Sequence, residues 1–477
     1  MVASRRAPSP GGAASKELRV NRHVAPMLRA VLLLGAALAL PGVARAGPKM
    51  LPDSTWIESW QLANGLKVVT HSIPRCPAIA ITVAYPAGTD ADPADRRGLA
   101  QLMAELQMMA PAGDVPERSR REMESLRALG WSLKVGRRAT QLSEVASLAQ
   151  FPGALRQVAT RMRGVTVSAP VLKSAIASVR RDLGEHLFGT VDNALYYQVR
   201  EAARGAEPNA AVALAAAKGL DALSASEVEQ RLHATLVPGG AVLALAGDLS
   251  RVNAHALVES QFGSLPAGAA AADPPAPAFR PGFRSVARPD VDAPIGVLAV
   301  NAPALSDSGH PGFFLSMLLI AEHCHQSWPI TPTLKTRFRY SLLDEPDLVR
   351  FYPLISPDST GAHALATELY QTLGGLMAMT VVRNEYDKLR YSVLWLLGGP
   401  MPPPVLEQVR GNGAALNNLC NSLAARELLG GETFWAGYRL RFLSEDARLA
   451  RWARWASLPE HQSGLLFTPL GKGRSAR

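Results

Sequence analysis

Gln101 and Glu105 lie four residues apart in the stretch from Gly98 to Met109, whose other side chains are mostly apolar. The apolar residues recur at helical spacing, which puts the amide of Gln101 and the carboxylate of Glu105 on one helix face. A carboxylate can ligate a metal ion, but zinc sites are built from His, Cys and carboxylate ligands, and an amide is a poor substitute for imidazole. Ala104, between them, has no group that can take a proton from water. We therefore expect a polar stripe on a half-buried helix and no catalytic centre.

The elements that position this helix are a strand from Ile79 to Tyr85 and a polar loop from Gly88 to Arg97. Strand, loop and Gly-Leu-Ala helix together resemble the entrance to the active site of the pitrilysin/insulinase family of zinc metallopeptidases. In that family the helix carries the inverted zinc motif H-x-x-E-H, with two histidine ligands and a glutamate general base. The motif falls on Gln101, Ala104 and Glu105, so all three functional positions are changed. Because a positioned general base is worth about 10²–10⁴ in rate, the resemblance implies an inactive peptidase homologue and no enzyme.

The resemblance also implies a third zinc ligand, a glutamate on a helix further along the chain. That place falls near residues 181–185, where either Asp182 or Glu185 could hold it. An active enzyme with altered ligands, such as Glu105 and Glu185, would still need an imidazole or thiolate that the sequence does not place. We therefore expect no metal and no cofactor in this chain, and zinc only in a partner chain.

A second functional segment of the family resembles residues 334–341 in the C-terminal half. There an arginine and a tyrosine hold the backbone carbonyl of the substrate. Tyr340 matches the tyrosine, whereas Lys335, Arg337 and Arg339 are alternatives for the arginine. An Arg with a Tyr hydroxyl can donate hydrogen bonds to a developing oxyanion, although solvated basic residues at a strand edge explain the same letters. The predicted substrate-binding residues are Arg337 and Tyr340.

The end of the first half supports the resemblance. Ser224 followed by Glu227 is a capping box that begins a helix running to about Leu236. A Val-Pro-Gly-Gly turn then leads into an apolar strand, residues 241–246, which is closed by Gly-Asp. This order resembles the end of a pitrilysin-family domain. Earlier, Asn64-Gly65 is typical of a hairpin turn between two strands.

The 477 residues exceed the size at which one core stops growing, so two or more domains are expected. An Ala/Pro-rich stretch without periodicity, residues 264–283, indicates a linker. It separates an N-terminal peptidase-like domain at 53–263 from a C-terminal one at 284–460, in which the strand and helix pattern restarts, and residues 461–477 are left as a tail. The predicted fold class is α+β, with two homologous α/β domains, each a mostly antiparallel sheet with helices packed on it.

Residues 1–46 have the pattern of a signal peptide with an N-terminal extension. A basic start precedes the apolar run Ala30 to Leu40, and Ala44-Arg45-Ala46 is typical of a cleavage site. Met1 to Pro26 either extends the basic region or lies upstream of the true start codon. Because the apolar run is short for a membrane span and the composition is bacterial in character, we expect a secreted, periplasmic protein with no stable membrane span.

The basic charge of the chain does not indicate nucleic acid as a partner. The formal net charge is +10, and the seven basic residues and one acidic residue before position 47 account for +6 of it. Basic residues interleaved with aromatic ones, the pattern of a nucleic-acid surface, are absent from the sequence. The high charge is therefore largely an effect of the targeting segment, and about +4 remains in the rest of the chain.

Three cysteines, Cys76, Cys324 and Cys420, are too few for a disulfide scaffold. One bridge between two of them and three buried thiols are both open alternatives. His323 and His325 flank Cys324, but adjacent side chains on a helix point apart and no second ligand pair is evident, so this cluster does not predict a metal site.

The leading functional hypothesis is a non-catalytic subunit of a secreted pitrilysin-family peptidase. The resemblance implies that such a chain forms a heterodimer with a zinc-motif subunit, supplies part of the chamber wall and grips a peptide substrate through Tyr340 and a nearby Arg. The alternative is a stand-alone structural or binding protein on an inactive peptidase fold, which would form a self-dimer with no zinc-carrying partner.

Overall fold

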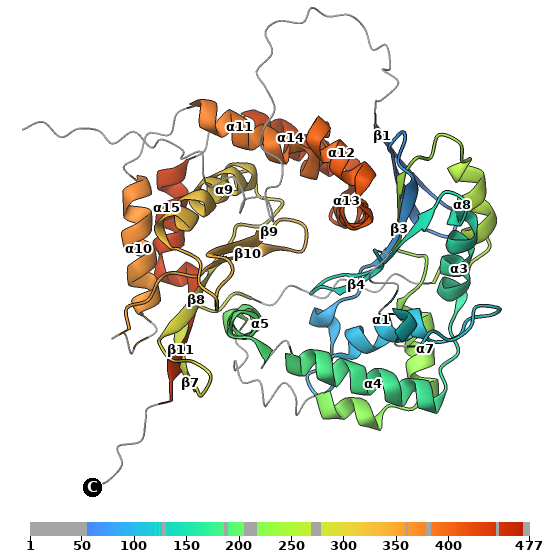
Figure 1. The fold of residues 1–477 in the computed structure, drawn as a ribbon, viewed down its shortest axis with the longest axis horizontal. Coiled ribbons are helices and arrows are strands. Elements are labelled where there is room, and N and C mark those ends of the chain that lie inside the picture. The colour runs from blue at the N-terminus through green and yellow to red at the C-terminus, as the bar shows by residue number, and fades with distance from the viewer. Residues whose placement is uncertain are drawn as a thin grey trace, which may run out of the picture.

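A computed structural model of the chain describes residues 55–470 except 120, 124, 126–129, 186–188, 205–216, 269–277, 358–360, 362, 378–382 and 445–447. The predicted signal peptide at 1–46 and part of the predicted linker at 264–283 lie outside the described residues. The rest forms two mixed sheets with helices packed on them (Figure 1). Along the described part of the chain, no helix is both long and apolar enough to cross a membrane.

The first sheet has six strands in the order β1-β2-β6-β3-β5-β4. These strands are β1 Trp56–Gln61, β2 Lys67–Ser72, β3 Ala78–Tyr85, β4 Ser132–Val135, β5 Thr140–Ser147 and β6 Val242–Gly247. The β1–β2 hairpin turns at Asn64-Gly65, as predicted, and Gly65 has the positive φ of +88° that favours glycine. Asn64 is buried, and its Nδ2 donates to the carbonyls of Phe262 and Leu265. β2 and β6 are parallel, while the other neighbours are antiparallel.

Five helices from the first half cover one face of this sheet: α1 Leu99–Met109, α3 Phe151–Arg163, α4 Ala169–Gly184, α7 Ala225–Thr235 and α8 Ala254–Phe262. The capping box predicted at Ser224 and Glu227 is present at the start of α7. α1 is more deeply buried than the sequence analysis expects, since of its eleven residues Gln101 alone is not buried. Apolar residues therefore surround this helix on nearly all sides.

The second sheet has five strands in the order β7-β11-β8-β10-β9. They are β7 Gly282–Arg288, β8 Ile295–Asn301, β9 Phe338–Ser341, β10 Glu345–Phe351 and β11 Gln462–Pro469. Helices α9 His310–Ser327, α10 Ala364–Met377 and α15 Leu449–Ser457 pack on one face of it. Helices α11 Arg383–Val393, α12 Pro403–Gly411, α13 Gly413–Leu428 and α14 Gly431–Ser444 complete the second half.

The structure differs from the sequence analysis at the C-terminus. Residues 461–477 are predicted as a tail, yet β11 lies inside the sheet, parallel to β7 and antiparallel to β8. The short apolar core of this strand, Leu465 to Phe467, is fully buried. The sequence analysis missed it because only a few apolar residues stand between a polar start and a basic end.

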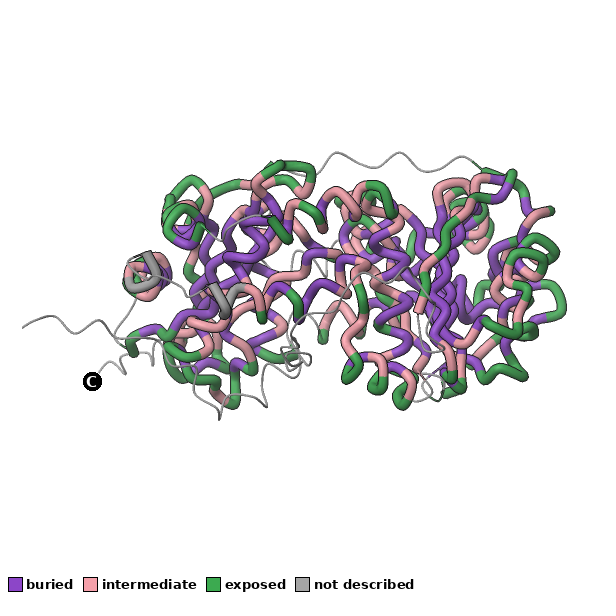
Figure 2. Tube along the Cα trace, turned by 90° about the horizontal axis from the view of Figure 1, so that it is seen from above, coloured by how far each residue is buried: buried purple, intermediate pink, exposed green. Residues whose placement is uncertain are grey.

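Each half covers the second face of the other half's sheet with one helix. α13, from the second half, lies on β3, β6, β5 and β2 of the first sheet. α5 Val191–Ala203, from the first half, lies on β11 and β8 of the second sheet. Figure 1 shows α13 against β3 on the face opposite α1, α3 and α8, and Figure 2 shows buried residues running through both halves and the region between them. The two halves are therefore interlocked.

We expect the exchanged helix α13 to carry much of the stability of the fold. Leu423 on α13 is 2% exposed and packs against the first sheet, so Leu423→Ala should lower the free energy of unfolding by about 2–5 kcal/mol. Leu440 on α14 is 70% exposed, and Leu440→Ala is the control, with a change of about 0.5 kcal/mol or less. Denaturant unfolding of both variants measures the difference. Equal effects would mean that α13 does not contribute to the first core as described.

Candidate functional site

Asp92 holds the start of α1. Its carboxylate accepts hydrogen bonds from the backbone N–H of Gly98 and of Ala100, both at 2.8 Å. Gly98 has a φ of +90°, and a Cβ there would lie 2.9 Å from Val179 Cγ1, so the close approach of α1 to α4 requires glycine. Burial raises the pKa of Asp92 to about 6, and the two backbone N–H groups limit that rise. The loop and helix predicted from the sequence are therefore locked together by one carboxylate.

Gln101, Ala104 and Glu105, which the sequence analysis matches to the zinc motif, all lie on α1. Ala104 is fully buried, Glu105 is 5% exposed, and Gln101 Nε2 donates to Glu105 Oε1 at 3.2 Å. An amide that donates to a carboxylate satisfies that carboxylate within the helix. Within the described residues, no group of three His, Cys, Asp or Glu side chains is placed to hold a metal ion. These residues do not fit a zinc ion.

Neither alternative for the third ligand completes a metal site. Asp182 is half-buried on α4, and Glu185 follows the last residue of that helix and is exposed. Neither of them forms a three-ligand group with Glu105 in the part of the chain that the structure describes. The cluster His323-Cys324-His325 lies on α9, with Cys324 fully buried and His323 bonded to Ser327 Oγ at 3.3 Å. All three cysteines of the chain are buried free thiols.

The predicted substrate-binding residues have internal partners. Arg337 is 2% exposed and donates from Nε to the carbonyl of Pro329 and from Nη1 to that of Tyr352. The Tyr340 hydroxyl lies 3.0 Å from the carbonyl of Pro346, to which it donates, and 3.1 Å from His310 Nε2. Burial raises the pKa of Tyr340 well above its usual value. Both side chains donate to backbone carbonyls of the chain itself, and this geometry supports a structural role.

Arg339 and Lys335 are the other two candidates for the substrate-binding basic residue. Arg339 lies 2.5 Å from Asp192 at the start of α5 and stacks over Tyr196 of the same helix. This contact holds the exchanged helix α5 against the second sheet. Lys335 is exposed. The segment 335–340 thus anchors α5 and the surrounding loops.

A buried ionic cluster joins the two halves at the edges of their sheets. Arg137, which is 4% exposed, lies 2.9 Å from Asp90 and 3.0 Å from Asp347 of the second half. Arg204 also pairs with Asp347. Burial acts to raise the pKa of Asp347, but Arg137 and Arg204 outweigh it and hold that pKa below its usual value. Sequence reasoning missed this cluster because 210 residues separate Arg137 from Asp347.

A cavity of about 800 Å³ lies elsewhere, between the β1–β2 edge of the first sheet and helices α12, α13 and α14. His71 and Arg426 line it, and both are more than nine-tenths buried. The sequence analysis singled out neither residue. Each stands alone in its segment without a neighbouring ligand or motif, so no spacing pattern in the sequence could have indicated them.

Comparison with solved structures identifies the class of fold. A protease from Helicobacter pylori superposes with a TM-score of 0.67 at 16% identity, over 87% of this chain and 100% of that chain. The inactive domain of a peptidase M16 from Pseudomonas fluorescens gives 0.60 at 15% identity, over 87% and 98%. The periplasmic protease PqqL from Escherichia coli gives 0.62 at 13% identity, and this chain spans 88% of its own length but 48% of that protein. No protein-family model and no curated protein matches the sequence.

The chain therefore has the two-domain fold of M16-like peptidases, which confirms the predicted fold class. The sequence identities are low, so this likeness is one of fold. The predicted domain boundaries and the predicted roles of Arg337 and Tyr340 stay predictions.

Removing the centre of the ionic cluster should be costly. Arg137→Met would remove a buried cation from between Asp90 and Asp347, which are partly buried. We expect a loss of about 2–3 kcal/mol in the free energy of unfolding, less than for a fully buried pair. The control is Lys134→Met, which breaks the 2.6 Å contact with Asp344 between half-exposed side chains and should cost about 1 kcal/mol or less. Urea unfolding at pH 7 measures both variants. Similar losses would contradict a special role for the buried cluster.

Asp92 should give the protein a stability component that falls as pH rises. Its folded pKa of about 6 lies above the usual 3.8, so the native state binds the proton more tightly than the unfolded chain does between about pH 4 and pH 6. We expect this term to lower the free energy of unfolding by about 2 kcal/mol across that window. Asp92→Asn removes it, and the difference between wild type and variant, measured at pH steps, isolates it from other titrating groups. A pH-independent difference would overturn the assignment.

Proposed function

We propose that this chain is a non-catalytic subunit of a periplasmic M16-like peptidase, and that it assembles with a second chain that carries the zinc motif. The observation that carries the proposal is the state of α1. The helix is kept in place by Asp92, while its three motif positions hold an amide, a buried methyl group and a satisfied carboxylate. A non-catalytic subunit needs the fold of the peptidase but no side chain that activates water.

The comparisons support assembly of two such units. This chain covers 48% of the Escherichia coli periplasmic protease, so that protein has room for a second stretch of similar length. It also covers 98% of a peptidase M16 domain that is described as inactive. The same fold therefore occurs in an inactive domain. A heterodimer would bring an active and an inactive unit together from two chains.

The alternative is a stand-alone binding or structural protein on the same fold. The hydrogen bonds of Arg337 and Tyr340 to backbone carbonyls of the same chain support this alternative. In this alternative the protein would form a monomer or self-dimer, and any ligand would bind away from the former peptidase centre.

The first experiment is isolation of the tagged chain from its own host at its natural expression level, followed by native mass spectrometry and zinc analysis. We expect a complex of two unlike chains of similar size with about one zinc ion, because a peptidase pair needs one complete zinc centre. A zinc-free monomer or homodimer would contradict the subunit proposal and favour the alternative.

A second measurement tests inactivity directly. The purified chain alone should not cleave unstructured peptides in a chelator-sensitive way. Glu105→Gln should bind peptides and unfold like wild type, since the amide replaces a carboxylate that already accepts from Gln101. Chelator-sensitive cleavage by the wild type that Glu105→Gln abolishes would show that Glu105 supports an unrecognised active site.

A further inference from the structure

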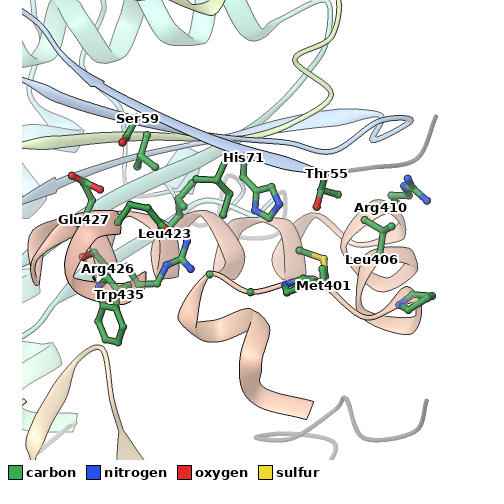
Figure 3. Close-up of a pocket in the computed structure, with 18 of the residues that line it drawn as sticks. Thr55, Ser59, His71, Met401, Leu406, Arg410, Leu423, Arg426, Glu427 and Trp435 are labelled. Atoms are coloured by element: carbon green, nitrogen blue, oxygen red, sulfur yellow. Dashed lines mark hydrogen bonds between the residues drawn. The ribbon is translucent and has the colours of Figure 1, made fainter. Parts of the chain in front are cut away.

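The cavity between the β1–β2 edge and the helices of the second half has the form of a ligand site. Its volume of about 800 Å³ lies in the usual range for small-molecule pockets. Its walls combine charged residues with apolar side chains, among them Ile57, Val69, Met401, Leu406, Leu423 and Trp435. Figure 3 shows His71 extending from the strands toward the helices, with Arg426 and Trp435 on the helical side. The cavity is separate from the α1 centre.

Arg426 places a desolvated positive charge in this cavity. Its side chain is 7% exposed, and its Nη1 is buried without a hydrogen-bond partner. The loop at Gly398 passes so close that a Cβ there would lie 2.3 Å from Nη1, which keeps the guanidinium in position. Burial lowers the pKa of Arg426 to about 10, so it stays charged at neutral pH. A buried cation of this kind requires an anionic partner to offset the cost of its burial.

The neighbouring charged side chains leave Arg426 uncompensated. Arg439 pairs with Glu432, and Arg410 pairs with Glu407 at 2.6 Å. No ion pair of Arg426 is present in the described part of the chain, since Glu427 and Glu432 act on it only from a greater distance. Arg75 and Arg410 also line the cavity, but Arg75 is exposed and Arg410 has Glu407 as its ion-pair partner. Arg426 is thus a buried lining cation that can match one negative charge, and the surrounding glutamates disfavour a dianion such as a phosphate monoester.

His71 supplies a second polar contact. It is 5% exposed, and its Nδ1 has no hydrogen-bond partner. Burial, and then the nearby Arg426, lower its pKa to about 4, so the imidazole is neutral and one ring nitrogen can donate a hydrogen bond. A neutral hydrogen-bond donor beside a guanidinium suits a carboxylate, whose two oxygens only accept hydrogen bonds.

We propose that this cavity binds a carboxylate carried on an apolar body, with Arg426 and His71 holding the carboxylate and the aliphatic and tryptophan walls holding the body. Two sources share this chemistry: a free carboxylic acid of small size and the C-terminus of a peptide with an apolar last residue. This binding site does not depend on the peptidase-subunit proposal, because none of its residues belongs to the α1 centre.

The test is isothermal titration of the purified full chain with matched pairs of probes. N-acetyl-phenylalanine is compared with its primary amide, and an unstructured octapeptide ending in Phe is compared with the same peptide amidated at its C-terminus. The acid should bind about tenfold to a hundredfold more tightly than its amide, because a hydrogen bond to a charged group is lost. If N-acetyl-phenylalanine binds more tightly than its amide and the two peptides do not differ, the ligand is a small acid. If the peptide with a free C-terminus binds more tightly than the amidated peptide, the ligand is a peptide C-terminus. Either result supports the proposal.

Three variants assign any binding to this cavity. Arg426→Met should remove the preference for acid over amide, and Ser59→Trp should fill the cavity from β1 and abolish binding of both probes. Ser59→Thr is the matched control and should bind as wild type does. If Arg426→Met does not fold, as judged by circular dichroism, Arg426→Lys replaces it and should reduce the preference. Equal binding of acids and amides by the wild type, no binding at millimolar concentration, or an acid preference that is unchanged in both Ser59→Trp and the Arg426 variant would overturn the proposal.

Discussion

The structure depends on the reciprocal burial of the two sheets. β6 is the clearest case, because Leu243 and Leu245 face the core under α1 and α3, while Val242, Ala244 and Ala246 face α13. Cys420 of α13 approaches so closely that its Sγ donates to the carbonyls of Ala80 and Ala244 on the strands below. A sheet with two apolar faces needs cover on both, and the first half supplies helices for one face only. The second half must therefore pack against the first sheet to cover its second face. In the same way, the second sheet needs α5 of the first half to cover its second face.

The helix α1 is fixed in this interlocked fold by contacts near its two ends and with α4. α1 is held by backbone hydrogen bonds to Asp92, by the glycine contact with α4 and by Arg161, whose Nη1 donates to the carbonyl of Ala110 just after the helix. None of these contacts involves the motif positions. A methyl group at Ala104 packs in the core at no cost, and the pair formed by Gln101 and Glu105 is satisfied within the helix. The stability of the fold is thus uncoupled from the catalytic groups.

Local patterns in the sequence predicted most of the first half, because its signals act over a few residues. The helix expected between Gly98 and Met109 is present, the capping box at Ser224 is present, and the hairpin turns at Asn64-Gly65. What escaped prediction depends on partners far along the chain. The unbroken apolar run of β6 indicates a strand, but only the structure shows that α13 covers its second face. In the same way, Arg337 and Tyr340 look like exposed donors in the sequence, whereas Pro329, Tyr352 and Pro346 take their hydrogen bonds in the fold.

The cavity near Arg426 follows from the same exchange. α13 covers the centre of the first sheet, and the chain on either side of it turns away from β1, which leaves a space beside the sheet edge lined by both halves. Arg426 stands in the last turn of α13, where the negative end of the helix dipole favours a cation. The helix therefore offsets part of the cost of burying this guanidinium, and Nη1 keeps its hydrogen-bonding capacity. The proposed carboxylate site is therefore separate from α1 and lies where the two halves of the chain meet.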